Sequence, residues 1–157
     1  MKKRRSAEGF TLIELLVVIT IIAILAALVL SVAGIVQQKA ARARAEAEIQ
    51  AMSAGLESYK ADNGDYPNWT NLTTSSSGNM TPVFQALNGT NGSGKVYVEF
   101  NKNQTNASGT TTNIIDPFGN VYGYQYPGAT NRSGTNFFDL FSVANASNNT
   151  NAWIKNW

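Results

Sequence analysis

The sequence contains no cysteine and no histidine, and it carries little charge. The lack of cysteine excludes disulfide bonds and thiolate metal sites. The lack of histidine excludes imidazole bases, imidazole metal ligands and Ser-His-Asp triads. Charged residues make up 14% of the chain, well below the roughly 25% of an ordinary soluble domain. The chain also shows no phosphate-binding loop and no cofactor motif, so we predict that it is not an enzyme and that it holds no cofactor.

The apolar residues are unevenly placed along the chain. Residues 15–36 read LLVVITIIAILAALVLSVAGIV and contain no charge. In a helix such a run spans roughly 33 Å, which is enough to cross the hydrocarbon core of a bilayer. Four of the twelve positive residues precede it, namely Lys2, Lys3, Arg4 and Arg5. We therefore predict that residues 10–36 form a transmembrane segment.

The segment after the apolar run has the pattern of an amphipathic helix. Its apolar residues recur at spacings of four and three and form one stripe: Ala45, Ile49, Met52, Leu56 and Tyr59. No proline interrupts residues 10–66, and Asn63-Gly64 offers a left-handed stop. We predict one helix from Phe10 to Asp62, roughly 80 Å long, with residues 37–62 as its amphipathic half.

Residues 63–157 are rich in Asn, Thr, Ser and Gly and are predicted to form a globular region. Three segments have strand character: Lys95–Phe100, Val121–Tyr126 and Phe137–Val143. We expect a small antiparallel sheet that covers the apolar stripe, with residues 68–95 and 101–113 as surface loops. The predicted fold class is α+β, a long N-terminal helix packed against a small C-terminal antiparallel β-sheet.

Tyr122, Tyr124 and Tyr126 fall on one face of the second predicted strand. A row of this kind suits either a face that stacks on carbohydrate or the packing of a sheet on a helix. Packing is the commoner reason for such a row, and we predict it here.

Three interpretations of the N-terminus compete. The first is a secretory signal peptide with Ser31-Val32-Ala33 as its small-residue cleavage site, which would release a secreted binding domain. The second is a plain membrane anchor with the basic residues held in the cytoplasm. Neither gives a purpose to Glu14, a carboxylate at the start of the apolar run, where a charge is costly. The third interpretation uses Glu14 together with Gly9.

The string GFTLIELLVVITIIAIL, Gly9 to Leu25, follows a short basic leader. It resembles the class III leader and N-terminal helix of type IV pilins and type II secretion pseudopilins, and it matches the family motif without a mismatch. The resemblance implies that residues 1–9 are a leader peptide, that prepilin peptidase cuts between Gly9 and Phe10, and that the same enzyme methylates the new amino group of Phe10. It also implies that the long helix packs into the core of a helical filament.

The resemblance implies that Glu14 acts in filament assembly together with Phe10. After cleavage Phe10 carries a cationic amine, and in the family the carboxylate is thought to meet this amine of a neighbouring subunit. Leaving either charge buried and unpaired costs several kcal/mol. We therefore expect the pair to fix the axial register of the subunits more than to add stability.

The resemblance extends beyond the N-terminus to the major pseudopilins of type II secretion. Residues 47–67, AEIQAMSAGLESYKADNGDYP, are similar to the end of the long helix in that group. The match continues in four further places: Asp116-Pro117-Phe118-Gly119-Asn120, Tyr122 to Gly128, Phe138 to Ser142 and the terminal Asn156-Trp157. The lack of cysteine also favours a pseudopilin, because many true pilins close a C-terminal loop with a disulfide.

The resemblance implies a structural subunit of a type II secretion pseudopilus, a homo-oligomeric filament that drives protein export. The implied partners are prepilin peptidase, minor pseudopilins, an inner-membrane platform protein, an assembly ATPase and, before assembly, membrane lipid. The implied location is the bacterial inner membrane, crossed once, with the C-terminal region in the periplasm. Two alternatives stay open: a type IV pilin of a surface filament for adhesion, motility or DNA uptake, and the secreted binding domain released after Ala33.

Major pseudopilins usually carry a calcium site in the loop after an Asp-x-x-Ser segment. Here that loop, residues 143–155, contains no Asp or Glu. Asn145 stands near one family aspartate and Trp153 at another. Calcium takes about six to eight oxygen ligands, and it stays an alternative here, with Asn145 as its candidate ligand. The other interpretation is that Asn hydrogen bonds and the packing of Trp153 and Trp157 hold the loop.

Removal of the leader changes the charge of the chain. Residues 1–9 hold four of the twelve Lys and Arg residues and one of the ten Asp and Glu residues. The mature chain therefore keeps eight basic and nine acidic side chains. Since the basic character belongs to the leader, we predict no nucleic-acid partner.

Overall fold

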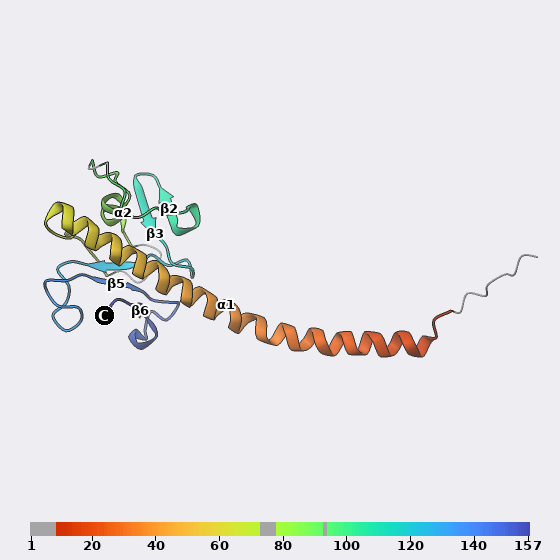
Figure 1. The fold of residues 1–157 in the computed structure, drawn as a ribbon. Coiled ribbons are helices and arrows are strands. Elements are labelled where there is room, and N and C mark those ends of the chain that lie inside the picture. Colours follow the sequence, from red (N-terminus) through yellow and green to blue (C-terminus); the bar gives the residue numbers. More distant parts are fainter. Residues whose placement is uncertain (1–8, 73–77, 93) are drawn as a thin grey trace, which may run out of the picture. The chain divides into compact units, whose positions relative to one another are not determined.

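A computed structural model of the chain describes residues 9–72, 78–92 and 94–157 (Figure 1). For residues 31–33, within the first range, it describes the backbone but not the side chains. Most of the leader therefore lies outside the described residues. The elements, in chain order, are α1 (Leu12–Asn63), β1 (Thr70–Asn71), α2 (Thr81–Leu87), the 3-10 helix η1 (Lys102–Gln104), β2 (Thr105–Ser108), β3 (Thr111–Ile114), β4 (Gly123–Gln125), β5 (Asp139–Ser142), the 3-10 helix η2 (Thr150–Ala152) and β6 (Ile154–Lys155).

The helix α1 is 52 residues long and confirms the predicted single helix. It ends where expected, because Gly64 adopts a left-handed conformation with φ of +86° and its N–H donates to the Lys60 carbonyl at 2.8 Å. The chain divides into two compact units, residues 1–39 and 40–157, so α1 begins in the first and ends in the second.

The described part of the first unit buries none of its side chains. Residues 10–30 and 34–39 are all exposed, and they include large apolar side chains such as Ile19, Leu25 and Leu28 at 56%, 57% and 62% exposure. The helix is long and apolar enough to cross a membrane. An apolar surface of this extent requires lipid or other protein chains to cover it.

The second unit has a core between the end of α1 and an antiparallel sheet of order β1-β4-β5-β6. The predicted stripe supplies the helix side of this core, with Ala45, Ile49, Met52 and Leu56 at most 3% exposed and Tyr59 partly buried. Gly123 pairs with Phe141 in the β4–β5 register. The sheet side of the core includes Tyr122, Tyr124, Phe138, Leu140 and Ile154. The α+β prediction is confirmed.

The tyrosine row packs on the rest of the fold rather than forming an open ligand face. Tyr122 and Tyr124 are fully buried. The Tyr122 hydroxyl donates to Oε2 of Glu48 on α1 at 2.7 Å, and the Tyr124 hydroxyl donates to the Pro67 carbonyl at 2.9 Å. Burial, followed by the hydrogen bond to Glu48, raises the pKa of Tyr122 well above its usual value, so this hydroxyl stays protonated.

Strand predictions in the polar part of the chain were partly wrong. Residues 95–100 form no strand, because the N–H groups of Tyr97 and Val98 both donate to the Leu87 carbonyl at the end of α2. Val98 instead packs against α1 at Gly55, where a Cβ atom would lie 2.3 Å from Val98 Cγ2. The predicted strands 121–126 and 137–143 are present in shorter form as β4 and β5.

The segments predicted as loops also hold regular structure. Residues 101–113 contain most of an antiparallel hairpin, β2–β3, in which Thr105 pairs with Ile114 and Ser108 with Thr111. Residues 68–95 contain β1 and α2. The sequence of β2 shows no alternation of apolar and polar residues, because this strand is largely exposed. The helix α2 buries Val83, Ala86 and Leu87.

Candidate functional site

The predicted processing site lies just before the first turn of α1. Gly9, Phe10 and Thr11 are outside the helix and exposed, with Phe10 at 86% exposure. Exposed, non-helical chain near a terminus is the usual place for proteolytic cleavage. The described residues at the Gly9–Phe10 bond are therefore exposed and non-helical, and cleavage itself stays a prediction.

Thr11 and Glu14 cap the N-terminus of α1. The Thr11 N–H donates to Glu14 Oε2 at 2.9 Å, and the Glu14 N–H donates to Thr11 Oγ1 at 3.3 Å. The Thr11 hydroxyl also donates to Glu14 Oε2 at 2.7 Å. This reciprocal pattern is a capping box, in which two side chains satisfy backbone N–H groups that the first turn leaves without helical partners.

The capping box is a feature that sequence reasoning missed. Glu14 was singled out as a carboxylate at the edge of an apolar run, but Thr11 was not recognised as its partner. The signal was present in the string Thr11-Leu12-Ile13-Glu14, which has the Thr-x-x-Glu spacing of a capping box before an apolar run.

The carboxylate of Glu14 has an unusual setting. It lines a shallow surface hollow together with Phe10, Ile13, Val17 and Val18. The carboxylate accepts two hydrogen bonds from Thr11, and both end on Oε2. A carboxylate accepts at about four positions, and Oε1 is not used by Thr11. The Glu14 carboxylate can therefore cap the first turn of α1 and still accept a hydrogen bond from a cationic group. Such a group would approach across the apolar surface around Glu14.

The calcium ligands implied by the family resemblance do not fit this chain. The side chain of Asn145, the candidate ligand, accepts at Oδ1 from Asn120 Nδ2 at 3.0 Å. The side chain of Trp153 brings no oxygen, and the described part of the chain holds no cluster of three or more His, Cys, Asp or Glu side chains. Neutral amide oxygens alone, already hydrogen-bonded, are a poor donor set for a cation whose affinity follows ligand charge.

Asp116 is a buried carboxylate, and both of its side-chain oxygens accept hydrogen bonds from within the chain. Oδ1 of Asp116 accepts from the N–H groups of Phe118 and Asn120 at 3.0 and 2.8 Å, and Oδ2 accepts from the Ser142 hydroxyl. The Gly119 N–H donates to the Asp116 carbonyl, which closes a turn at residues 116–119. Asp116 therefore holds a turn and is not aimed at a metal.

Comparison with known proteins identifies the first part of the chain by its motif. The family described as the prokaryotic N-terminal methylation motif matches residues 4–30. This range includes Gly9, Phe10 and Glu14. No solved structure matches the chain significantly.

Similar proteins cover the chain to different extents. A "Type II secretion system core protein G" from Pseudomonas aeruginosa is 31% identical over 163 aligned positions, which cover 99% of this chain and 98% of that protein. Proteins of the same name from Aeromonas hydrophila and Escherichia coli are 45% and 40% identical over 67 residues, which cover 43% of this chain and 46% of each relative.

Proposed function

Since this chain belongs to the type II secretion system core protein G family, whose members are structural subunits of the pseudopilus, we propose that its Gly9–Glu14 segment is the site of both processing and filament assembly. The observation that supports this most is the exposure of every described side chain in residues 10–30, with Glu14 at the start of the run. A surface that apolar needs to be covered by lipid before assembly and by other copies of the helix afterwards.

The proposed processing follows the family motif. Prepilin peptidase cuts between Gly9 and Phe10 and methylates the amine of Phe10. We expect protein extracted from membranes to begin at Phe10 and to be heavier by one methyl group, as measured by intact mass and sequencing of the N-terminal peptide. A chain that begins at Gly34, as a signal peptide cut after Ala33 requires, contradicts the proposal.

The proposed location and partners follow from the same role. The subunit crosses the bacterial inner membrane once, with residues 63–157 in the periplasm. Its partners are other copies of the chain, minor pseudopilins, a platform protein and an assembly ATPase. A surface pilin is not favoured, because a relative that is named for type II secretion matches nearly the full chain.

Thr11→Ala is expected to reduce filament yield about five-fold. The substitution removes the capping side chain, which is worth roughly 0.5–2 kcal/mol, and one kcal/mol corresponds to about a five-fold change in an equilibrium. The Glu14 carboxylate remains available to the amine, so assembly is weakened and not lost. The measurement is the amount of subunit that sediments as filament after cell disruption, relative to the detergent-extracted membrane pool.

Thr11→Ser is the matched control, because it keeps the hydroxyl that accepts from the Glu14 N–H. We expect its filament yield to equal that of the unmodified chain. Equal yields for Thr11→Ala and Thr11→Ser would show that the capping box has no part in assembly.

A further inference from the structure

The loop between β5 and β6, residues 143–153, is closed by contacts within the chain. Its turn places Ala144 and Asn145 in the left-handed region, with φ of 47° and 61°. The N–H groups of Ala146, Asn149 and Ala152 donate in turn to the carbonyls of residues 143, 146 and 149, at 2.7 to 3.0 Å. The carbonyl oxygens of residues 143, 146 and 149 therefore already accept hydrogen bonds within the chain.

The Trp153 side chain stabilises the end of this loop by a ring contact and a hydrogen bond. Its indole ring stacks on Phe141, with ring centroids 4.7 Å apart and planes within 4° of each other. Its Nε1–H donates to the Ala146 carbonyl at 2.9 Å. A single side chain thus joins the end of the loop to its first turn and to β5. Trp153 stands at a position where the family resemblance implies an aspartate.

The Phe141 ring also packs against Gly123 and Trp157. A Cβ atom on Gly123 would lie 2.2 Å from the ring, so glycine is needed in β4 for the ring to pack there. The ring of Trp157 meets Phe141 edge to face at 5.8 Å. We call Phe141, Trp153 and Trp157 the aromatic clasp. Because aromatic pairs stabilise a structure beyond the effect of the apolar area that they bury, the aromatic clasp holds this short loop firmly.

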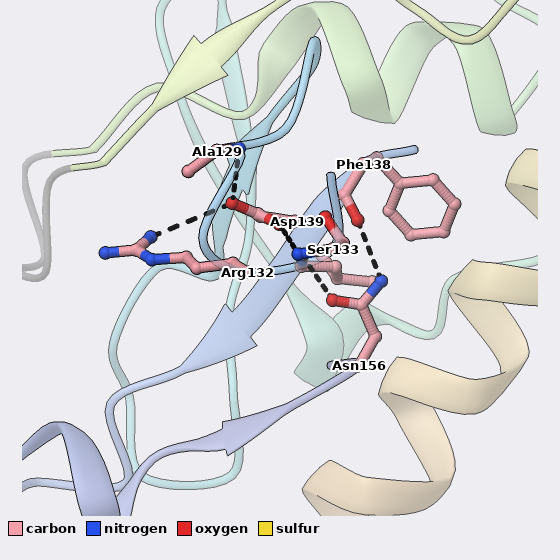
Figure 2. A network of polar contacts seen from close by, with 7 residues as sticks. Ala129, Arg132, Ser133, Phe138, Asp139 and Asn156 are labelled. Atoms are coloured by element: carbon pink, nitrogen blue, oxygen red, sulfur yellow. Dashed lines mark hydrogen bonds and ion pairs between the residues drawn. The ribbon is translucent and has the colours of Figure 1, made fainter. Parts of the chain in front are cut away.

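The segment after the loop is bound to β5 by Asn156. Its Oδ1 accepts from the Leu140 N–H at 2.8 Å, and its Nδ2 donates to the Phe138 carbonyl at 3.0 Å (Figure 2). Its backbone N–H donates to the Leu140 carbonyl at 3.2 Å. From the helix side, Arg42 donates to the Ala152 carbonyl at 3.0 Å. The C-terminal end of the loop is thus anchored to β5 and to α1 by groups of the chain itself.

From these contacts we infer that the aromatic clasp and the Asn156 hydrogen bonds take the place of the calcium ion that the family resemblance implies, so that the C-terminal loop of this subunit folds and stays closed without calcium. The chain carries an indole where the family resemblance implies a carboxylate, and the carbonyl oxygens of residues 143, 146, 149 and 152 accept from donors within the chain. The filament role does not depend on this inference, and either can fail alone.

The test is thermal unfolding of the full chain in detergent, followed by near-ultraviolet circular dichroism in excess calcium and in excess EGTA. We expect the same midpoint in both conditions. Trp153→Ala is expected to lower the midpoint by about 10 °C in both conditions. A midpoint of the unmodified chain that falls in EGTA overturns the inference, and so does an unchanged midpoint for Trp153→Ala.

A milder pair of variants tests the clasp without the risk of unfolding. Trp153→Phe keeps an aromatic ring against Phe141 but removes the N–H that donates to Ala146. Trp69→Phe is the matched control, because it removes an indole N–H that donates to the Asn79 carbonyl at 2.8 Å elsewhere in the fold. Hydrogen exchange of peptides from residues 143–157 is expected to rise several-fold for Trp153→Phe and to stay unchanged for Trp69→Phe. Equal exchange in both variants overturns the role given to the indole.

Discussion

Glu14→Val is expected to leave cleavage after Gly9 largely intact and to lower filament yield by about 100-fold or more. In the proposed filament the Glu14 carboxylate pairs with the amine of Phe10 on a neighbouring copy. Valine would leave that amine buried without a partner, which costs about 3–5 kcal/mol for a broken buried pair. The measurement is the ratio of cleaved to uncleaved subunit, together with a count of filaments by electron microscopy. Normal filaments from Glu14→Val would contradict this account.

The valine variant also removes the capping box, so a second variant has to separate charge from capping. Glu14→Gln does so, because glutamine at the third helical position still accepts from the Thr11 N–H. It keeps the helix start and loses the negative charge. We expect Glu14→Gln to fail in assembly almost as completely as Glu14→Val, whereas Thr11→Ala only weakens it. Efficient assembly of Glu14→Gln would assign Glu14 to capping alone.

The long helix was predictable because two independent patterns agree along it. Residues 15–36 form an uncharged run, and the stripe from Ala45 to Leu56 continues at helical spacing. The stop at Gly64 follows from the need for a left-handed residue at a helix end. The processing motif at Gly9–Glu14 was equally accessible, because it depends on adjacent residues and on no tertiary contact.

The polar strands were not predictable in the same way. The strand β2, Thr105–Ser108, is largely exposed and carries no apolar alternation, so periodicity gives no signal there. The segment 95–100 has a strand-like alternation of apolar residues. However, the backbone N–H groups of Tyr97 and Val98 donate hydrogen bonds to the Leu87 carbonyl at the end of α2. Pairing choices of this kind are set by tertiary contacts, which override local propensity.

The network around Asp139 was also missed, because its partners are separated from it in sequence by a loop. Asp139 is fully buried on β5. Its Oδ2 accepts from the Ala129 N–H at 3.0 Å, and its Oδ1 accepts from the N–H and the hydroxyl of Ser133 (Figure 2). Arg132 lies 3.9 Å from Oδ2. The carboxylate thereby fixes the connection between β4 and β5, and the sequence shows only an acidic residue within an apolar strand.

Asp139→Asn is expected to lower the free energy of unfolding by about 3–5 kcal/mol, the usual loss when one partner of a buried charged pair is removed. The reason is geometric: both carboxylate oxygens face N–H donors, from Ala129 and Ser133, so either orientation of an amide sets its NH₂ group against a donor.

The measurement is denaturant unfolding of the full chain in detergent, followed by tryptophan fluorescence. Asp62→Asn is the control, because Asp62 pairs with Lys95 at an exposed position, and exposed pairs add little to stability. An Asp139→Asn midpoint equal to that of Asp62→Asn would mean that the backbone holds the β4–β5 connection without the Asp139 carboxylate. A midpoint for Asp139→Asn far below that of Asp62→Asn would show that the buried Asp139 carboxylate orders the β4–β5 connection. That connection belongs to the sheet that also contains β6.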